Sequence, residues 1–122
     1  MASTIYRNLT MRILVCGGRD FKDRNLVYQA LIDYMLEENI TIIHGAASGA
    51  DSLANTWATA FNHKVESYPA DWNKYGKRAG YIRNTQMLNE GKPDLVIAFP
   101  GGKGTQMMIN LAEAAKVPVI KV

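Results

Sequence analysis

Short apolar runs that end in turns of small residues are the feature that most constrains the fold of this chain. Residues 95–98 are apolar and lead directly into the turn 99–105, which reads Phe-Pro-Gly-Gly-Lys-Gly-Thr. The same arrangement occurs twice more, with turns at residues 17–20 and 44–51. Glycine lacks a Cβ atom, so such a turn can present backbone N–H groups and a helix N-terminus to an anion. A single turn of this kind is equally well explained as a tight connection, and only the repetition favours a binding site.

Segments whose apolar residues recur at helical spacing separate these runs. The first extends from Leu26 to Met35 and has Asp23 as its predicted N-cap. Three more helices are expected at about residues 53–61, 77–89 and 105–115, two short strands at 65–68 and 117–122, and a polar loop at 70–76. We therefore expect a single domain over residues 12–122 with five strands and four helices. Residues 1–11 are expected to form a tail or an edge extension.

Strands joined by single helices predict right-handed crossovers and a parallel sheet with helices on both faces. The near-continuous apolar character of the strands agrees, because parallel strands are buried on both sides. The expected fold is a small Rossmann-like three-layer α/β/α domain with strand order 3-2-1-4-5. Ligands of such sheets bind at the carboxyl ends of the strands, where the winding reverses between strands one and four. All three turns converge on that edge, which predicts a shared anion site.

Composition excludes several classes of protein. The 122 residues are 48% hydrophobic and 20% charged, which is typical of one soluble globular domain. No apolar run approaches the roughly 20 residues that span a bilayer, and no export signal opens the chain, so we expect a cytoplasmic protein without a membrane partner. The single cysteine, Cys16, excludes a disulfide framework and offers no metal-ligand spacing, and we expect no metal or cofactor. The net charge of +3 suits an anionic ligand but is small for a nucleic-acid partner.

Polar residues in the first two turns each have a functional and a structural interpretation. Arg19 can bind a phosphate through two hydrogen bonds and Asp20 can hold a hydroxyl, or the two side chains can pair across the turn. Residues 48–49 begin a helix whose free N–H groups can receive an anion. Asp51 either favours the dipole of that helix or binds a sugar hydroxyl. His44 either contacts the ligand or is a hydrogen-bonded structural residue.

A stretch at residues 71–84 mixes aromatic, basic and glycine residues in a loop that leads into the third helix. Its aromatic side chains can stack on a base while its basic side chains balance phosphate. The members concerned are Trp72, Tyr75, Lys77, Arg78 and Arg83. The alternative is a solvated basic face with Trp72 as a lid over the core. Arg83 is the strongest candidate, because it lies at helical spacing from the small residues 79–80, which would let a ligand approach.

The candidate ligand-binding residues share a position in or beside these turns. They are Gly17, Gly18, Arg19, Asp20, His44, Gly45, Ser48, Gly49, Asp51, Asp71, Trp72, Arg83, Asn84, Pro100, Gly101, Gly102, Lys103, Gly104 and Thr105.

Five ordered motifs resemble the YspA, cpYpsA-related branch of the SLOG superfamily. They are Gly-Gly-Arg-Asp-Phe at 17–21, His-Gly-Ala-Ala-Ser-Gly-Ala-Asp at 44–51, Ala-Asp-Trp at 70–72, Ala-Gly-x-x-Arg-Asn at 79–84 and the turn at 99–105. The likeness covers about residues 12–122. SLOG domains are Rossmann-like modules for nucleotides or nucleotide-derived molecules, and they include the Lonely Guy phosphoribohydrolases and DprA-type proteins. The resemblance implies a nucleoside phosphate or an ADP-ribose-like ligand, and a homo-oligomer of at least two chains.

The same resemblance bears on catalysis. The Lonely Guy enzymes read Pro-Gly-Gly-x-Gly-Thr-x-x-Glu, and the glutamate works with an arginine to break an N-glycosidic bond. Arg83 is the match for that arginine, but Met108 stands at the glutamate position and cannot act as acid or base. Cleavage of a ribosyl bond needs a carboxylate. The candidate catalytic residues are therefore Asp20, Asp51 and Asp71, together with Arg83.

Three functions remain open at this point. The chain is a sensor or sequestering protein for a nucleotide-type ligand, a nucleotide N-glycosidase or phosphoribohydrolase, or a DprA-like protein for single-stranded DNA. Met108 favours the first over the second, and the small net charge weighs against the third.

Overall fold

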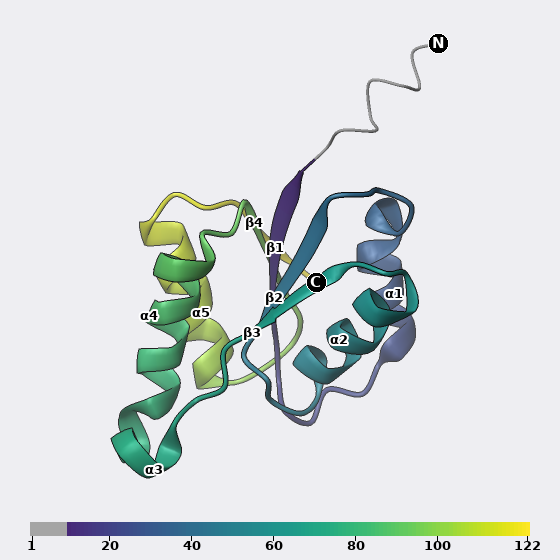
Figure 1. Cartoon of the computed structure of the whole chain (residues 1–122). Coiled ribbons are helices and arrows are strands. Elements are labelled where there is room, and N and C mark those ends of the chain that lie inside the picture. Colours follow the sequence, from purple (N-terminus) through teal and green to yellow (C-terminus); the bar gives the residue numbers. More distant parts are fainter. Residues whose placement is uncertain (1–9) are drawn as a thin grey trace.

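The computed structural model describes residues 10–122 and contains a five-stranded parallel sheet with helices on both faces (Figure 1). The strand order β3-β2-β1-β4-β5 confirms the predicted Rossmann-like topology. In chain order the strands are β1 (Met11–Cys16), β2 (Ile40–His44), β3 (Lys64–Ser67), β4 (Leu95–Ala98) and β5 (Val119–Lys121). The expected N-terminal tail lies almost entirely outside the described residues, since β1 begins at Met11.

Four long helices correspond to the four that the sequence predicts. They are α1 (Arg24–Leu31), α2 (Ala50–Ala60), α4 (Ala79–Gly91) and α5 (Lys103–Ala114). Asp23 caps α1 as predicted, because its carboxylate accepts the N–H of Leu26 at 3.0 Å. A short 3₁₀ helix, η2 (Ile32–Tyr34), continues α1. Within the described residues no helix has both the length and the apolar character required to cross a membrane.

The expectation of an irregular loop at residues 70–76 is wrong. A helical turn, α3 (Trp72–Tyr75), occupies most of that segment, and the 3₁₀ turn η3 (Gly76–Arg78) links it to α4. The cause is local, because the Asp71 carboxylate accepts the N–H of Lys74 at 3.1 Å and so starts a helix. Gly76, with a φ of +58°, then separates α3 from η3.

Alternate residues of the central strands face opposite layers of the fold. Ile13 and Val15 of β1 pack with α1 and α2, whereas Leu14 and Cys16 pack with α4 and α5. Figure 1 shows the two helix pairs on the two sides of the sheet, with α3 at the lower end. This period-two burial keeps the sheet rigid between its helices, so the loops at its carboxyl edge start from fixed positions.

Candidate functional site

A cleft of about 750 Å³ opens at the carboxyl ends of β1 and β4, where the winding of the sheet reverses. Its walls come from the turns after these strands, from the start of α2, and from α3, α4 and α5. The structure brings most of the predicted site residues together here. Those that line the cleft are Gly17, Gly18, Arg19, Asp20, Asp51, Trp72, Arg83, Asn84, Pro100, Gly101, Gly102, Gly104 and Thr105.

The turns after β1 and β4 meet edge to edge. The N–H of Gly18 donates to the carbonyl oxygen of Pro100 at 2.9 Å. A Cβ atom at Gly101 would lie 2.7 Å from the nitrogen of Gly18, too close for any side chain. Glycine at this position is therefore what allows the two turns to form one continuous wall of the cleft.

The turn after β2 supports the first turn from the other side. Gly49 has a φ of +76°, and a Cβ atom there would lie 2.6 Å from the carbonyl oxygen of Arg19. The hydroxyl of Ser48 donates to that same oxygen at 3.2 Å, and the N–H of Ala50 donates to the carbonyl oxygen of Gly18, also at 3.2 Å. Gly49 thus acts through packing and does not line the cleft.

Asp51 holds the turn that precedes its own helix. One carboxylate oxygen accepts the N–H of Gly45 at 3.0 Å and the N–H of Ala47 at 3.2 Å. The side chain is 6% exposed, and burial raises the pKa of Asp51 although these N–H groups and His44 oppose the shift. Asp51 reaches the cleft wall, but its hydrogen bonds fix the path of residues 45–47.

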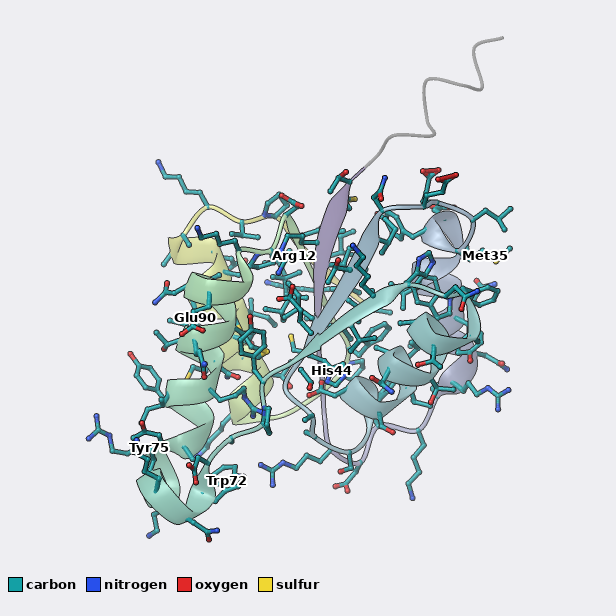
Figure 2. All side chains as sticks on the ribbon, in the orientation of Figure 1. Arg12, Met35, His44, Trp72, Tyr75 and Glu90 are labelled. Carbon is teal, nitrogen blue, oxygen red and sulfur yellow. The ribbon has the colours of Figure 1, made fainter. Side chains whose placement is uncertain are left out.

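His44 has an internal partner at each ring nitrogen. Its Nδ1 accepts the N–H of Ala46 at 2.9 Å, so the ring proton lies on Nε2, which faces the Asn55 side-chain oxygen at 3.0 Å. The residue is 4% exposed and lies inside the molecule at the end of β2 (Figure 2). It does not line the cleft, which favours the structural interpretation of this histidine.

Arg83 links α4 to the turn after β2. Its Nη1 donates to the carbonyl oxygen of Gly45 at 2.5 Å, and its Nε donates to the side-chain oxygen of Asn84 at 2.9 Å. Asn84 in turn donates to the carbonyl oxygen of Gly104 at 3.3 Å, at the start of α5. Burial lowers the pKa of Arg83, and the carboxylate of Asp51 opposes that shift. Guanidinium groups stay charged in proteins, so a partly buried cation lies at the cleft wall.

Trp72 stands at the mouth of the cleft with nearly half of its surface exposed. The guanidinium carbon of Arg19 lies 5.4 Å from the centre of its ring, a cation–π distance. The edge of the Trp72 ring would lie 3.5 Å from a Cβ atom at Gly80. Figure 2 shows Trp72 and Tyr75 extending from α3 at the lower end of the molecule.

Several predicted residues lie outside the cleft. Asp71 caps α3 and Lys103 begins α5 with its side chain exposed. Gly45 and Ser48 line a smaller groove of about 340 Å³ beside the cleft. In the part of the chain that the structure describes, no group of three or more His, Cys, Asp or Glu residues is arranged to hold a metal ion.

The cleft also has an apolar side that the sequence analysis missed. Phe21, Met87 and Met107 line it, together with the small residues Ala47 and Gly80. Helical spacing was the available signal, because residues 80, 83, 84 and 87 share one face of α4. Met107 thus faces the cleft, whereas its neighbour Met108 is fully buried in the core between α5 and the sheet.

Comparison of the sequence with models of protein families agrees with this geometry. The model of the YspA, cpYpsA-related SLOG family matches residues 11–75, more than half of the chain. The chain belongs to this SLOG family. The match contains the first two turns, and Arg83 and the turn after β4 lie beyond it. Membership suggests a ligand related to nucleotides.

The sequence was also compared with individual proteins and with solved structures. The Gene 61 protein of Mycobacterium phage D29 is 39% identical over 118 residues, which cover 89% of this chain and 94% of that protein. No solved structure matches the SLOG chain.

Proposed function

We propose that this SLOG protein binds a nucleotide-type ligand in the cleft, a nucleoside phosphate or an ADP-ribose-like molecule, and acts as a sensor or sequestering protein. The observation that carries the proposal is the meeting of three glycine-containing turns at the switch point, beside two arginines. Packing explains why each turn contains glycine but does not require cationic side chains on the same wall. Ligand pockets typically have volumes of about 300–1,000 Å³, and the cleft lies within that range.

The start of α5 is the proposed phosphate position. Its N-cap residue is Gly102, so no side chain satisfies the first N–H groups of the helix. A Cβ atom at Gly102 or Gly104 would meet nothing within 4 Å, which leaves the space before these N–H groups open. An anion there would gain hydrogen bonds and the favourable end of the helix dipole.

The apolar side of the cleft is the proposed position for the base. Trp72 offers an exposed aromatic face, and Phe21 and Met107 line the same cavity. Stacking on an aromatic face stabilises any base by about 1–3 kcal/mol without reading its identity. This division matches an amphipathic ligand with an anionic end and an aromatic end.

Hydrolysis of an N-glycosidic bond is the alternative, and one observation favours it. Asp20 and Asp51 line the same cleft as Arg83. The Asp51 carboxylate already accepts two N–H groups, however, and the buried Met108 offers no acid or base. The alternative therefore depends on Asp20 as the group that activates water or stabilises positive charge.

Mass spectrometry of the protein after incubation with a panel of nucleotides and ADP-ribose derivatives separates the two functions. Release of an intact ligand on denaturation supports binding, whereas a free base together with a ribose phosphate would establish hydrolysis. The Gly102→Val variant should abolish binding and keep the fold, because its side chain would fill the proposed phosphate position. Asn110→Val, an exposed change two turns further along α5, is the matched control. Unchanged affinity in Gly102→Val would reject the phosphate position. Light scattering of the same samples tests the predicted homo-oligomer.

A further inference from the structure

The charges of the chain are segregated between two ends of the molecule. Residues 25–63 contain no lysine or arginine, whereas residues 72–89 contain four such cations and no aspartate or glutamate. Figure 2 shows Met35 and Tyr75, which belong to these two segments, at opposite ends of the molecule. The net charge of +3 therefore conceals one acidic end and one basic end. Surfaces of opposite charge attract each other and fix the register of a contact.

The acidic end contains an apolar groove. The groove has a volume of about 400 Å³, lies between α1 and α2, and shares no lining residue with the cleft. Leu36, beyond η2, is 82% exposed, and the side chains of Asp33 and Glu38 are exposed in the same segment. We call the groove together with residues 32–38 the acidic face. The apolar lining of the groove consists of Tyr28, Ile32, Met35, Trp57 and Phe61.

The basic end carries a projecting helical turn. Residues 71–78, which include α3 and η3, are all exposed, and Figure 1 shows α3 at the lower end of the molecule. The ammonium group of Lys74 lies 5.1 Å from the centre of the Tyr75 ring, and Lys77 and Arg78 follow in η3. Tyr81, in the first turn of α4, is half exposed. We call residues 74–81 the basic face, which offers aromatic rings surrounded by positive charge.

The two faces complement each other, whereas neither face complements itself. Contact between two basic faces, or between two acidic faces, would bring like charges together at a cost in free energy. Contact between unlike faces brings cations to carboxylates and aromatic rings to an apolar groove. Such a contact is head to tail, because it uses a different surface of each copy.

We propose that the basic face of one copy docks on the acidic face of a second copy, so that the chain assembles head to tail. Tyr75 and Tyr81 enter the apolar groove, and Lys77 and Arg78 lie against the carboxylates of residues 33 and 38. The contact needs no ligand in the cleft and therefore goes beyond the proposed function. It also goes beyond the expectation of a homo-oligomer, because it states which surfaces meet and excludes two-fold symmetry for this contact.

Sedimentation velocity of the full chain at rising concentration tests the proposal. We expect the wild-type protein to form oligomers that dissociate as sodium chloride is raised from about 0.05 M to about 0.5 M, because salt screens exposed charges. The pair Lys77→Glu and Arg78→Glu should be monomeric at low salt, and so should the separate pair Asp33→Lys and Glu38→Lys. The new carboxylates precede α4 and the new cation at residue 33 follows α1, so both pairs agree with the helix dipoles and should fold.

Recombination of the altered faces gives the decisive measurement. A mixture of the two variants restores unlike charges across the contact and should assemble again. A single chain that carries all four reversals should also assemble, because its two faces have merely exchanged their charges. Lys92→Glu with Lys116→Glu changes the net charge by the same amount as the reversal of the basic face. These exposed positions lie outside both faces, so this control should assemble as the wild-type protein does.

Three results would overturn the proposal. The first is a wild-type protein that stays monomeric, or an oligomer that is insensitive to salt, and neither measurement requires a variant to fold. The second is a mixture of the two variants that stays monomeric although circular dichroism shows both to be folded. The third is a monomeric wild-type protein whose basic face binds a poly(dT) strand, which would assign that face to nucleic acid. None of these results would affect the proposed binding of a nucleotide in the cleft.

Discussion

The Nη1 atom of Arg83 donates to the carbonyl oxygen of Gly45 at 2.5 Å, and this contact exists because residue 45 has no side chain. A Cβ atom at Gly45 would lie 2.8 Å from the guanidinium carbon of Arg83. One glycine therefore sets the position of the cation that both cavities share. The sequence alone suggests phosphate contact for Gly45, whereas its structural effect is exerted through Arg83.

The Gly45→Ala variant should weaken ligand binding more than it weakens the fold. The end of the Arg83 side chain can swing away, so we expect the midpoint of thermal unfolding to fall by about 4 °C, equivalent to about 1 kcal/mol. Ligand affinity should fall about tenfold, because a charge-assisted hydrogen bond contributes about 1.5–3 kcal/mol. Calorimetric titration with the ligand identified by mass spectrometry measures this loss.

A double-mutant cycle tests the route of this effect. In an Arg83→Ala background, Gly45→Ala should cause no further loss of affinity, because the cation it displaces is already absent. Additive losses in the double variant would show that Gly45 acts independently of Arg83.

Removal of the Asp51 carboxylate should destabilise the turn after β2. Asp51→Ala leaves the N–H groups of Gly45 and Ala47 without their acceptor, at a cost of about 1–3 kcal/mol for each buried group. Asp51→Asn keeps an oxygen in the same place and should retain most of the free energy of unfolding. Urea denaturation at pH 7 measures both variants, and equal losses would contradict the assigned role of the oxygen.

The stability of the wild-type protein relative to Asp51→Asn should also depend on pH. Burial raises the folded-state pKa of Asp51 above the ordinary value of 3.8, so the folded protein binds this proton more tightly than the unfolded chain does. The resulting stabilisation is complete below pH 3.8 and is lost as the pH rises through the folded-state pKa. The free energy of unfolding of the wild-type protein should therefore decline relative to Asp51→Asn between pH 3.5 and pH 7. A relative increase over that range would reverse the assigned sign.

The sequence predicted the sheet and the edge at which the three turns meet, but not the hydrogen-bond partners of the candidate site residues. Strand order and the three turns follow from apolar runs and glycines, which are local patterns that burial on both faces imposes. The partner of Asp51 depends on the path of the preceding turn, where Ala46 has a φ of +59° and directs two N–H groups back to the carboxylate. No periodicity encodes that path. The helix α3 was missed for a similar reason, since a single capping residue starts it.

Two glycines at the site should respond in opposite ways to alanine. Gly49→Ala places a side chain at positive φ and against the carbonyl oxygen of Arg19. We therefore expect the free energy of unfolding to fall by about 1–3 kcal/mol. Gly104→Ala meets open space within α5 and should raise it by up to about 1 kcal/mol. Because Gly104 lines the cleft, the second variant should be more stable yet bind the ligand less well. Unchanged affinity in Gly104→Ala would place the ligand away from the start of α5.

The thiol of Cys16 provides a probe of the same edge of the sheet. Burial, with a smaller effect from Asp51, raises its pKa from the ordinary value of 9.0 to about 12, which lowers the thiolate fraction near pH 8 about a thousandfold. Labelling by a disulfide reagent should therefore be slow in the folded protein and fast in urea.

Cys16 directly precedes the glycines of the first turn, so a ligand held by that turn should slow labelling further. Where labelling requires unfolding, ligand at a hundred times its dissociation constant should slow it about a hundredfold. Rapid labelling without denaturant, or a labelling rate insensitive to saturating ligand, would contradict the burial of Cys16 or its link to the site.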